Sequence, residues 1–159
     1  MGTANAFVVV APHVGWRHGE ITERRTHTEY AACLRWLVDE AFPDVPRIRI
    51  VQDHLCTHDP SSLDATFPPE EAHRIRQRLE FHYTPVQGSW LNMAEIEIGI
   101  FARGCLSRPL DGLVDLRQRA AGGIAERNAA RRPIPWQFTT PDARRKLSRL
   151  YPSVKTSLD

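Results

Sequence analysis

Two acidic residues, Asp53 and Glu95, stand where carboxylates can do chemistry. Asp53 closes the segment RIRIVQD (47–53) where a predicted strand enters a loop, and open α/β sheets place functional groups at that position. Glu95 lies near the start of the predicted helix 92–104, and the 41 residues between the two are enough for a helical crossover and a return strand. Two carboxylates brought together in this way can bind Mg²⁺ or Mn²⁺. Such ions can activate water or a 3′-hydroxyl and stabilise the leaving oxygen of a phosphodiester.

Each carboxylate also has a structural interpretation. Asp53 can be a turn residue that bonds its own backbone, and Asn92 with Glu95 has the spacing of a helix capping box. Apolar residues occupy nearly every face of 92–104, which predicts that both of its glutamates are buried and need neutralisation, a partner or a metal. Glu97 lies about 200° around the helix from Glu95, so we predict that Glu97 is structural or paired with an arginine.

The loop DHLCTH offers two further hypotheses. His54 and His58 can join Asp53 in a transition-metal site, although loop histidines are more often simply exposed. Cys56 and His58 can form a nucleophile pair, but no nearby residue orients the histidine, which disfavours this interpretation.

Hydrophobic periodicity predicts the elements that must position these residues. The helix at 26–42 is predicted to have Thr28 as its N-cap and Pro43 as its stop, and the final helix to have Thr140 as its cap. The predicted order is two strands within 6–24 joined at Val14-Gly15, a helix at 26–42, a strand at 47–53, a helix at 68–79, a strand at 79–85, and helices at 92–104, at 112–129 and from 140. This order predicts one α/β domain with a mixed sheet, spanning 1–159.

Composition is that of a soluble globular protein, with 42% apolar and 25% charged residues. The sequence has no signal peptide and no apolar run of membrane-spanning length, and its three dispersed cysteines favour reduced thiols in a cytoplasm. Residues 1–100 carry nine basic and fourteen acidic side chains, whereas 101–159 carry twelve and five. The basic helical tail from about 112 can therefore bind a polyanion such as DNA. Alternatively, its arginines simply form the solvent-exposed faces of the helices. The candidate phosphate contacts are Arg131, Arg132, Arg144, Arg145, Lys146 and Arg149.

Four segments, VQDHLCTH, FHYTP, GSWLNMAEIEIGIF and WQFTTPDARRKL, resemble in order and spacing the DDE transposases of bacterial insertion sequences related to the mariner group. The resemblance covers nearly the whole chain, and SWLN followed by the glutamate is its most specific part. It implies an RNase H-like α/β fold in which two aspartates and one glutamate hold two Mg²⁺ or Mn²⁺ ions. Asp53 matches the second aspartate and Glu95 the glutamate, while His54 replaces the usual asparagine.

The aspartate that comes first in the family ends a central strand before the early hairpin, and this sequence begins at that hairpin. The resemblance therefore implies an RNase H-like sheet without its first central strand and an incomplete metal-dependent DNA endonuclease and strand transferase. Another strand or a second copy would restore the site by placing Asp39, Asp44 or Asp59 beside the two carboxylates. The alternative is a non-catalytic remnant that binds DNA, or that pairs as a homodimer or with a full-length transposase. A third hypothesis is a small fold without a surviving role.

Overall fold

The antiparallel hairpin expected near the start of the chain is formed by β1 (Asn5–Ala11) and β2 (Trp16–Thr22). Its last register pair is Ala11 opposite Trp16. Gly15 in the connecting turn has a φ of 66°, in the left-handed region that glycine adopts without steric cost. The turn therefore lies where the sequence predicted it.

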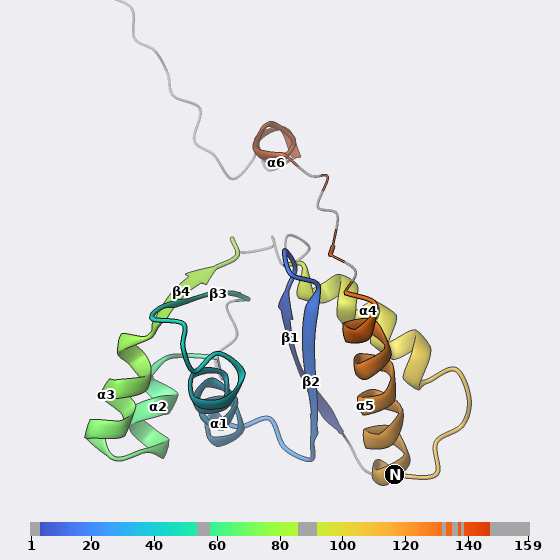
Figure 1. Cartoon of the computed structure of the whole chain (residues 1–159), viewed down its shortest axis with the longest axis horizontal. Coiled ribbons are helices and arrows are strands. Elements are labelled where there is room, and N and C mark those ends of the chain that lie inside the picture. The colour runs from blue at the N-terminus through green and yellow to red at the C-terminus, as the bar shows by residue number, and fades with distance from the viewer. Residues whose placement is uncertain are drawn as a thin grey trace, which may run out of the picture.

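The structure is a computed structural model that describes residues 4–53, 58–85, 92–131, 133–134, 137 and 139–146. After the hairpin, its elements are α1 (His27–Trp36) continued by the π-helical turn η1 (Leu37–Ala41), β3 (Ile48–Gln52), α2 (Ser61–Thr66), α3 (Pro69–Gln77), β4 (Leu79–Tyr83), α4 (Ala94–Cys105), α5 (Leu113–Ala129) and α6 (Thr140–Lys146). The predicted α/β class is confirmed, and the arrangement is compatible with the expected RNase H-like fold (Figure 1). The short helix α2 was not predicted.

The four described strands form two pairs. β1 and β2 are antiparallel, whereas β3 and β4 are parallel with Ile48 opposite Leu79. A parallel pair needs a crossover, which α2 and α3 supply between β3 and β4. Because parallel neighbours end at the same edge, Gln52 and Tyr83 come to lie opposite each other just before the residues of interest.

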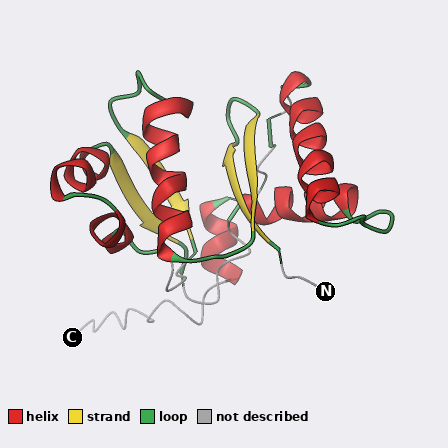
Figure 2. Cartoon of the chain, turned by 90° about the horizontal axis from the view of Figure 1, so that it is seen from below, coloured by secondary structure: helices red, strands yellow, loops and turns green. Residues whose placement is uncertain are grey.

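Helices cover the hairpin on both faces, as Figures 1 and 2 show from two directions. On one face, Phe7 packs into the main core with Leu34 of α1, Leu63 of α2 and Ile75 of α3. On the other face, a smaller core joins Ile21 of β2, Cys105 of α4 and Ala120 of α5. Because successive side chains of a strand point to opposite faces, the hairpin contributes residues to two separate cores.

Gly19 explains how closely α5 approaches β2. A Cβ atom at this position would lie 2.6 Å from Cδ1 of Ile124, so a side chain here would require Ile124 to shift. The missing side chain at Gly19 lets the helix pack directly on the strand.

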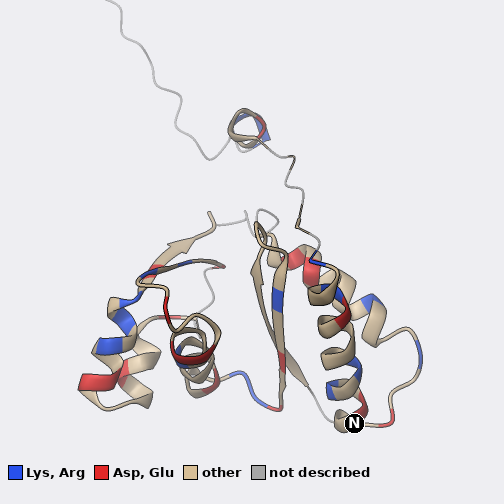
Figure 3. Cartoon of the chain, viewed as in Figure 1, with Lys and Arg blue, Asp and Glu red and all other residues tan. Residues whose placement is uncertain are grey.

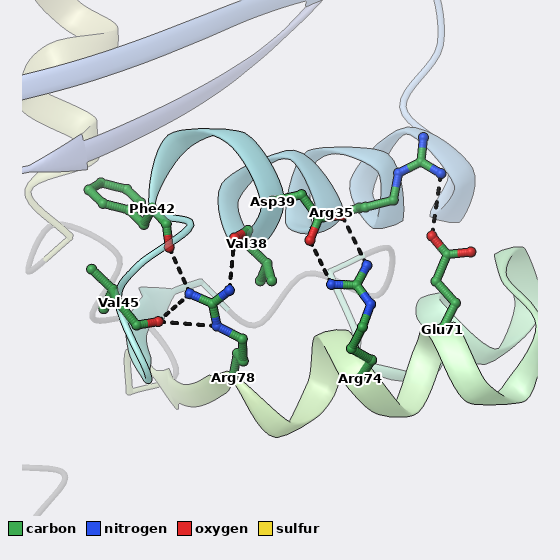
Figure 4. A network of polar contacts seen from close by, with 8 residues as sticks. All are labelled: Arg35, Val38, Asp39, Phe42, Val45, Glu71, Arg74 and Arg78. Carbon is green, nitrogen blue, oxygen red and sulfur yellow. Dashed lines mark hydrogen bonds and ion pairs between the residues drawn. The ribbon is translucent and has the colours of Figure 1, made fainter.

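Polar contacts close both ends of α1. Thr26 and Glu29 form a capping box, in which the Thr26 hydroxyl accepts from the backbone N–H of Thr28 at 3.2 Å and the Glu29 carboxylate accepts from the backbone N–H of Thr26 at 2.8 Å. The prediction of Thr28 as the cap was wrong, because the side chain two residues earlier satisfies the free donors. At the other end, the guanidinium of Arg78 donates to the carbonyl oxygens of Val38, Phe42 and Val45 (Figure 4). Arg78 thereby satisfies carbonyls that the end of a helix leaves free.

Two further local predictions need correction. The cap of α6 is Thr139, which exchanges side-chain and backbone hydrogen bonds with Asp142, and not Thr140. In β4, the alternation of apolar Leu79, Phe81 and Tyr83 with polar residues predicts that Tyr83 lies on the buried face, but Tyr83 is 37% exposed, whereas Thr84 is buried. The strand ends there, so the alternation of faces does not continue through it.

The described helices include none that combines the length and the apolar character needed to cross a membrane.

Stability should depend on pH through His18, whose ring stacks on Trp36 at a centroid distance of 3.9 Å. Burial lowers the pKa of His18 below its ordinary value of 6.5, although Glu20 partly opposes this. The unfolded chain therefore binds the proton more readily, and stability should fall as the pH drops below about 6.5 toward the folded-state pKa. Urea unfolding at pH 7.5 and pH 5.5 measures this loss, and His18→Phe should reduce it while keeping the stack. An unchanged loss in His18→Phe would contradict the assignment.

Candidate active site

Asp53 follows the last residue of β3, at the carboxyl edge of the parallel pair. Its Oδ1 accepts two hydrogen bonds, one from the Thr84 hydroxyl at 2.9 Å and one from the Asn92 side-chain amide at 3.2 Å. Thr84 follows β4, and Asn92 precedes α4. Three chain segments thus converge on one oxygen of one carboxylate. Oδ2 has no hydrogen bond from any described residue, which leaves it available as a ligand.

A buried polar contact fixes the end of β3 that carries Asp53. Gln52 accepts a hydrogen bond from the Tyr30 hydroxyl at 2.5 Å and donates one to the His58 carbonyl at 2.7 Å. The His58 ring stacks on Tyr30 at 4.7 Å, and burial lowers its pKa. Gln52 therefore links the end of β3 to Tyr30 of α1 and to His58. Asp53 directly follows this anchored strand end.

Asn92 connects Asp53 to the start of α4. While its amide donates to Asp53, its Oδ1 accepts from the backbone N–H of Ala94 at 3.1 Å. One side chain thus holds the strand end and the first turn of the helix together, and Glu95 lies in that first turn.

The expected capping box is not formed in the described part of the chain. The N-cap residue of α4 is Met93, whose side chain makes no capping hydrogen bond, although Asn92 before it accepts from the Ala94 N–H. The Glu95 side chain is exposed and makes no hydrogen bond or ion pair with a described residue, while its backbone N–H donates to the Asn92 carbonyl at 3.0 Å. The prediction that both glutamates are buried is therefore wrong for Glu95, because Ile96 and Ile98 are themselves 44% and 41% exposed.

Glu97 is the buried glutamate, and it is paired with arginines, which is one of the two roles predicted for it. One carboxylate oxygen lies 2.9 Å from Nε of Arg17, and Arg127 donates to both oxygens at 2.7 and 3.0 Å. Burial by itself would raise the pKa of the Glu97 carboxyl, but the two guanidinium groups more than offset it and hold the pKa below its ordinary value. Figure 3 shows basic and acidic residues meeting where the start of α4 lies beside the end of α5.

Oxygen ligands suit Mg²⁺ and Mn²⁺, and Oδ2 of Asp53 and the exposed carboxylate of Glu95 have that chemistry. Among the described residues, no group of three or more His, Cys, Asp or Glu is arranged to hold a metal ion. Asp39 does not supply a third ligand, because it is paired with Arg74 at 2.6 Å (Figure 4). Asp59 accepts from the backbone N–H of Ser61 at 2.8 Å, at the start of α2.

Several predicted residues lie outside the described ones. These are His54, Cys56, Arg132 and Arg149, so the histidine metal site and the Cys56 pair stay predictions. Of the basic tail, α6 carries Arg144, Arg145 and Lys146 and buries none of its residues. Arg145 is paired with Asp142 at 2.7 Å, and Arg131 is exposed at the end of α5.

Sequence reasoning missed Thr84 and Asn92 as partners of Asp53. Asn92 stands in the SWLN motif, but its spacing from Glu95 suggested a cap. Thr84 stands in the FHYTP segment, but the resemblance assigned it no role. Their common contact depends on the relative placement of three segments, which periodicity does not give.

Comparison with known protein families identifies the chain. The sequence profile of the DDE superfamily endonucleases matches residues 1–117, which is most of the chain and includes Asp53 and Glu95. The chain therefore belongs to the DDE superfamily endonucleases. No curated protein and no solved structure matches it.

Thr84→Val tests the support of Asp53 with little change of shape. Thr84 is buried, and its loss would remove one of the two donors to the Asp53 carboxylate, so the free energy of unfolding should fall by roughly 1.5–3 kcal/mol. Urea denaturation measures it.

Thr66→Val is the matched control. The buried Thr66 hydroxyl has no hydrogen-bond partner in the described part of the chain, so the same substitution there should cost nothing. Equal losses in the two variants would show that the Thr84 contact does not support Asp53.

Proposed function

We propose that the chain is part of the catalytic domain of a transposase-type DDE endonuclease from a bacterial insertion sequence, which cuts and joins DNA by metal-assisted phosphoryl transfer. Asp53 and Glu95 are the proposed ligands of Mg²⁺ or Mn²⁺. The observation that carries the proposal is the hydrogen bond from Asn92 to Asp53. Asn92 belongs to the SWLN motif, which precedes Glu95. The hydrogen bond therefore connects this motif to the end of β3, which carries Asp53.

In this proposal, different residues of the chain have different roles. Thr84 and Asn92 hold Oδ1 of Asp53, so that Oδ2 is presented in a fixed direction. Glu95 is exposed on the first turn of α4 and forms no ion pair with a described residue. Its carboxylate can therefore bind a cation without first breaking an ion pair. When bound, the cation activates water or a DNA 3′-hydroxyl and stabilises the leaving oxygen.

A second candidate function is a non-catalytic DNA-binding or dimerising remnant. The observation that favours it is that the described residues group no third acidic side chain with Asp53 and Glu95. The resemblance assigns the third carboxylate to a strand before β1. Nicking of supercoiled plasmid in Mn²⁺ distinguishes the two functions, because the remnant binds DNA without cutting it.

Mn²⁺ binding tests the proposed ligands directly. Asp53→Asn and Glu95→Gln should each weaken binding by at least tenfold, about 1.4 kcal/mol, because each removes a charged oxygen ligand. Isothermal titration calorimetry of the folded variants measures the change.

Glu126→Gln is the control for the loss of charge alone, since Glu126 is exposed on α5, a helix that carries neither proposed ligand. Its affinity should stay within twofold of the wild type. An absence of Mn²⁺ binding by the wild type, or equal affinities in all four proteins, would refute the metal site.

DNA binding should depend on α6. Its basic side chains are exposed, and phosphate contacts release counterions, so binding to a 30-base-pair duplex should weaken as salt rises. Arg144→Gln with Arg145→Gln should lower the slope of log affinity against log salt by about 2. Arg24→Gln with Arg25→Gln removes two exposed arginines elsewhere and should leave the slope nearly unchanged. Equal slopes for both double variants would place the DNA contact outside α6.

A further inference from the structure

The two glutamates of α4 face in opposite directions. Residues two apart on an α-helix lie about 200° apart around its axis. Glu97 is 4% exposed and points to β2 and α5, whereas Glu95 is exposed. Any contact that fixes Glu97 inward therefore fixes the direction of Glu95.

Apolar packing does little to set the rotation of the first half of α4. Glu97 and Cys105 are the only buried residues of this helix, and Cys105 is its last residue. Ile96 and Ile98, the neighbours of Glu97, are 44% and 41% exposed. The buried contact in this half of the helix is therefore an ion pair, and apolar packing against the smaller core begins one turn later, at Phe101.

The contacts of Glu97 are made to two anchored partners. Arg17 of β2 is 3% exposed, and its guanidinium also donates to the Gly15 carbonyl at 2.8 Å. Asn128 of α5 exchanges two 2.8 Å hydrogen bonds with the backbone of Arg17. Because Arg127 is adjacent to Asn128, the same turn of α5 contacts both Glu97 and β2. We call Arg17, Glu97 and Arg127 the clamp.

We propose that the clamp is a positioning device for Glu95, acting with the Asn92–Asp53 contact. Asn92 lies three residues before Glu95 and holds the start of α4 against the end of β3. Glu97 lies two residues after it and holds the helix against β2 and α5. Glu95 is thus fixed between two tethered points, in the turn that meets Asp53. The inference rests on the proposed function, in which Glu95 and Asp53 bind one divalent cation.

Arg127→Gln tests the clamp, because positioning and simple electrostatics predict opposite results. Because it weakens the repulsion of a cation, removing a positive charge beside the start of α4 should by itself tighten Mn²⁺ binding. Loss of the clamp should instead weaken it, by at least fivefold. Isothermal titration calorimetry, at a temperature where circular dichroism shows each variant folded, measures the affinity.

Arg117→Gln is the matched control. Arg117 lies on the same helix and donates to the Ile21 carbonyl of β2 at 3.2 Å, so the variant loses the same charge and a contact to the same strand without touching α4. Its Mn²⁺ affinity should stay within twofold of the wild type. Arg127→Lys keeps the charge but not the two-pronged contact, so its affinity should lie between those of Arg127→Gln and the wild type.

Unchanged or tighter Mn²⁺ binding in Arg127→Gln would overturn the proposal. The clamp would then only hold α4, β2 and α5 together. If the wild type binds no Mn²⁺, the proposed function fails, and residual dipolar couplings of the α4 amides decide the geometric part. A rotation of α4 in Arg127→Gln but not in Arg117→Gln would support the clamp as the element that orients Glu95. Identical couplings in both variants would overturn it.

Discussion

A buried carboxylate must be paired, and the way Glu97 meets this requirement organises half of the molecule. An unpaired charge in that position would cost several kcal/mol. Arg17 and Arg127 supply the pairing from β2 and α5, so the hairpin, α4 and α5 meet at one polar point. The small apolar core of Ile21, Cys105 and Ala120 lies along the same three elements. Polar pairing and packing thus fix the same arrangement.

The other half of the molecule is organised by the crossover between two parallel strands. α2 and α3 bring β4 beside β3, and Arg78, just after α3, holds the end of the α1 and η1 segment through three carbonyl oxygens. The strand ends then carry Asp53 and Thr84 side by side. The candidate site lies where this half meets the first turn of α4, since Asn92 reaches across to Asp53. Its geometry depends on both halves together.

Local patterns predicted most of the elements because they reflect local physics. A β-branched run predicted β1, apolar residues at alternate positions predicted β3 and β4, and apolar periodicity predicted α1. Boundaries were less certain, because a cap depends on which hydroxyl reaches a free N–H; Thr26 and Thr139 take roles that were assigned to neighbours. The burial of α4 was misjudged for another reason. An apolar sequence shows what a helix can bury, but only its neighbours decide what it does bury.

By itself, the sequence determined the α/β class, the positions of Asp53 and Glu95 at a strand end and a helix start, and that Glu97 is structural or paired with an arginine. These follow from spacing, helix geometry and the cost of an isolated charge. The tertiary structure decided which arginines pair with Glu97, because Arg17 and Arg127 are distant in sequence. It also decided that Thr84 and Asn92 share one oxygen of Asp53. Such contacts depend on how separate segments are placed in space, and no local pattern encodes that placement.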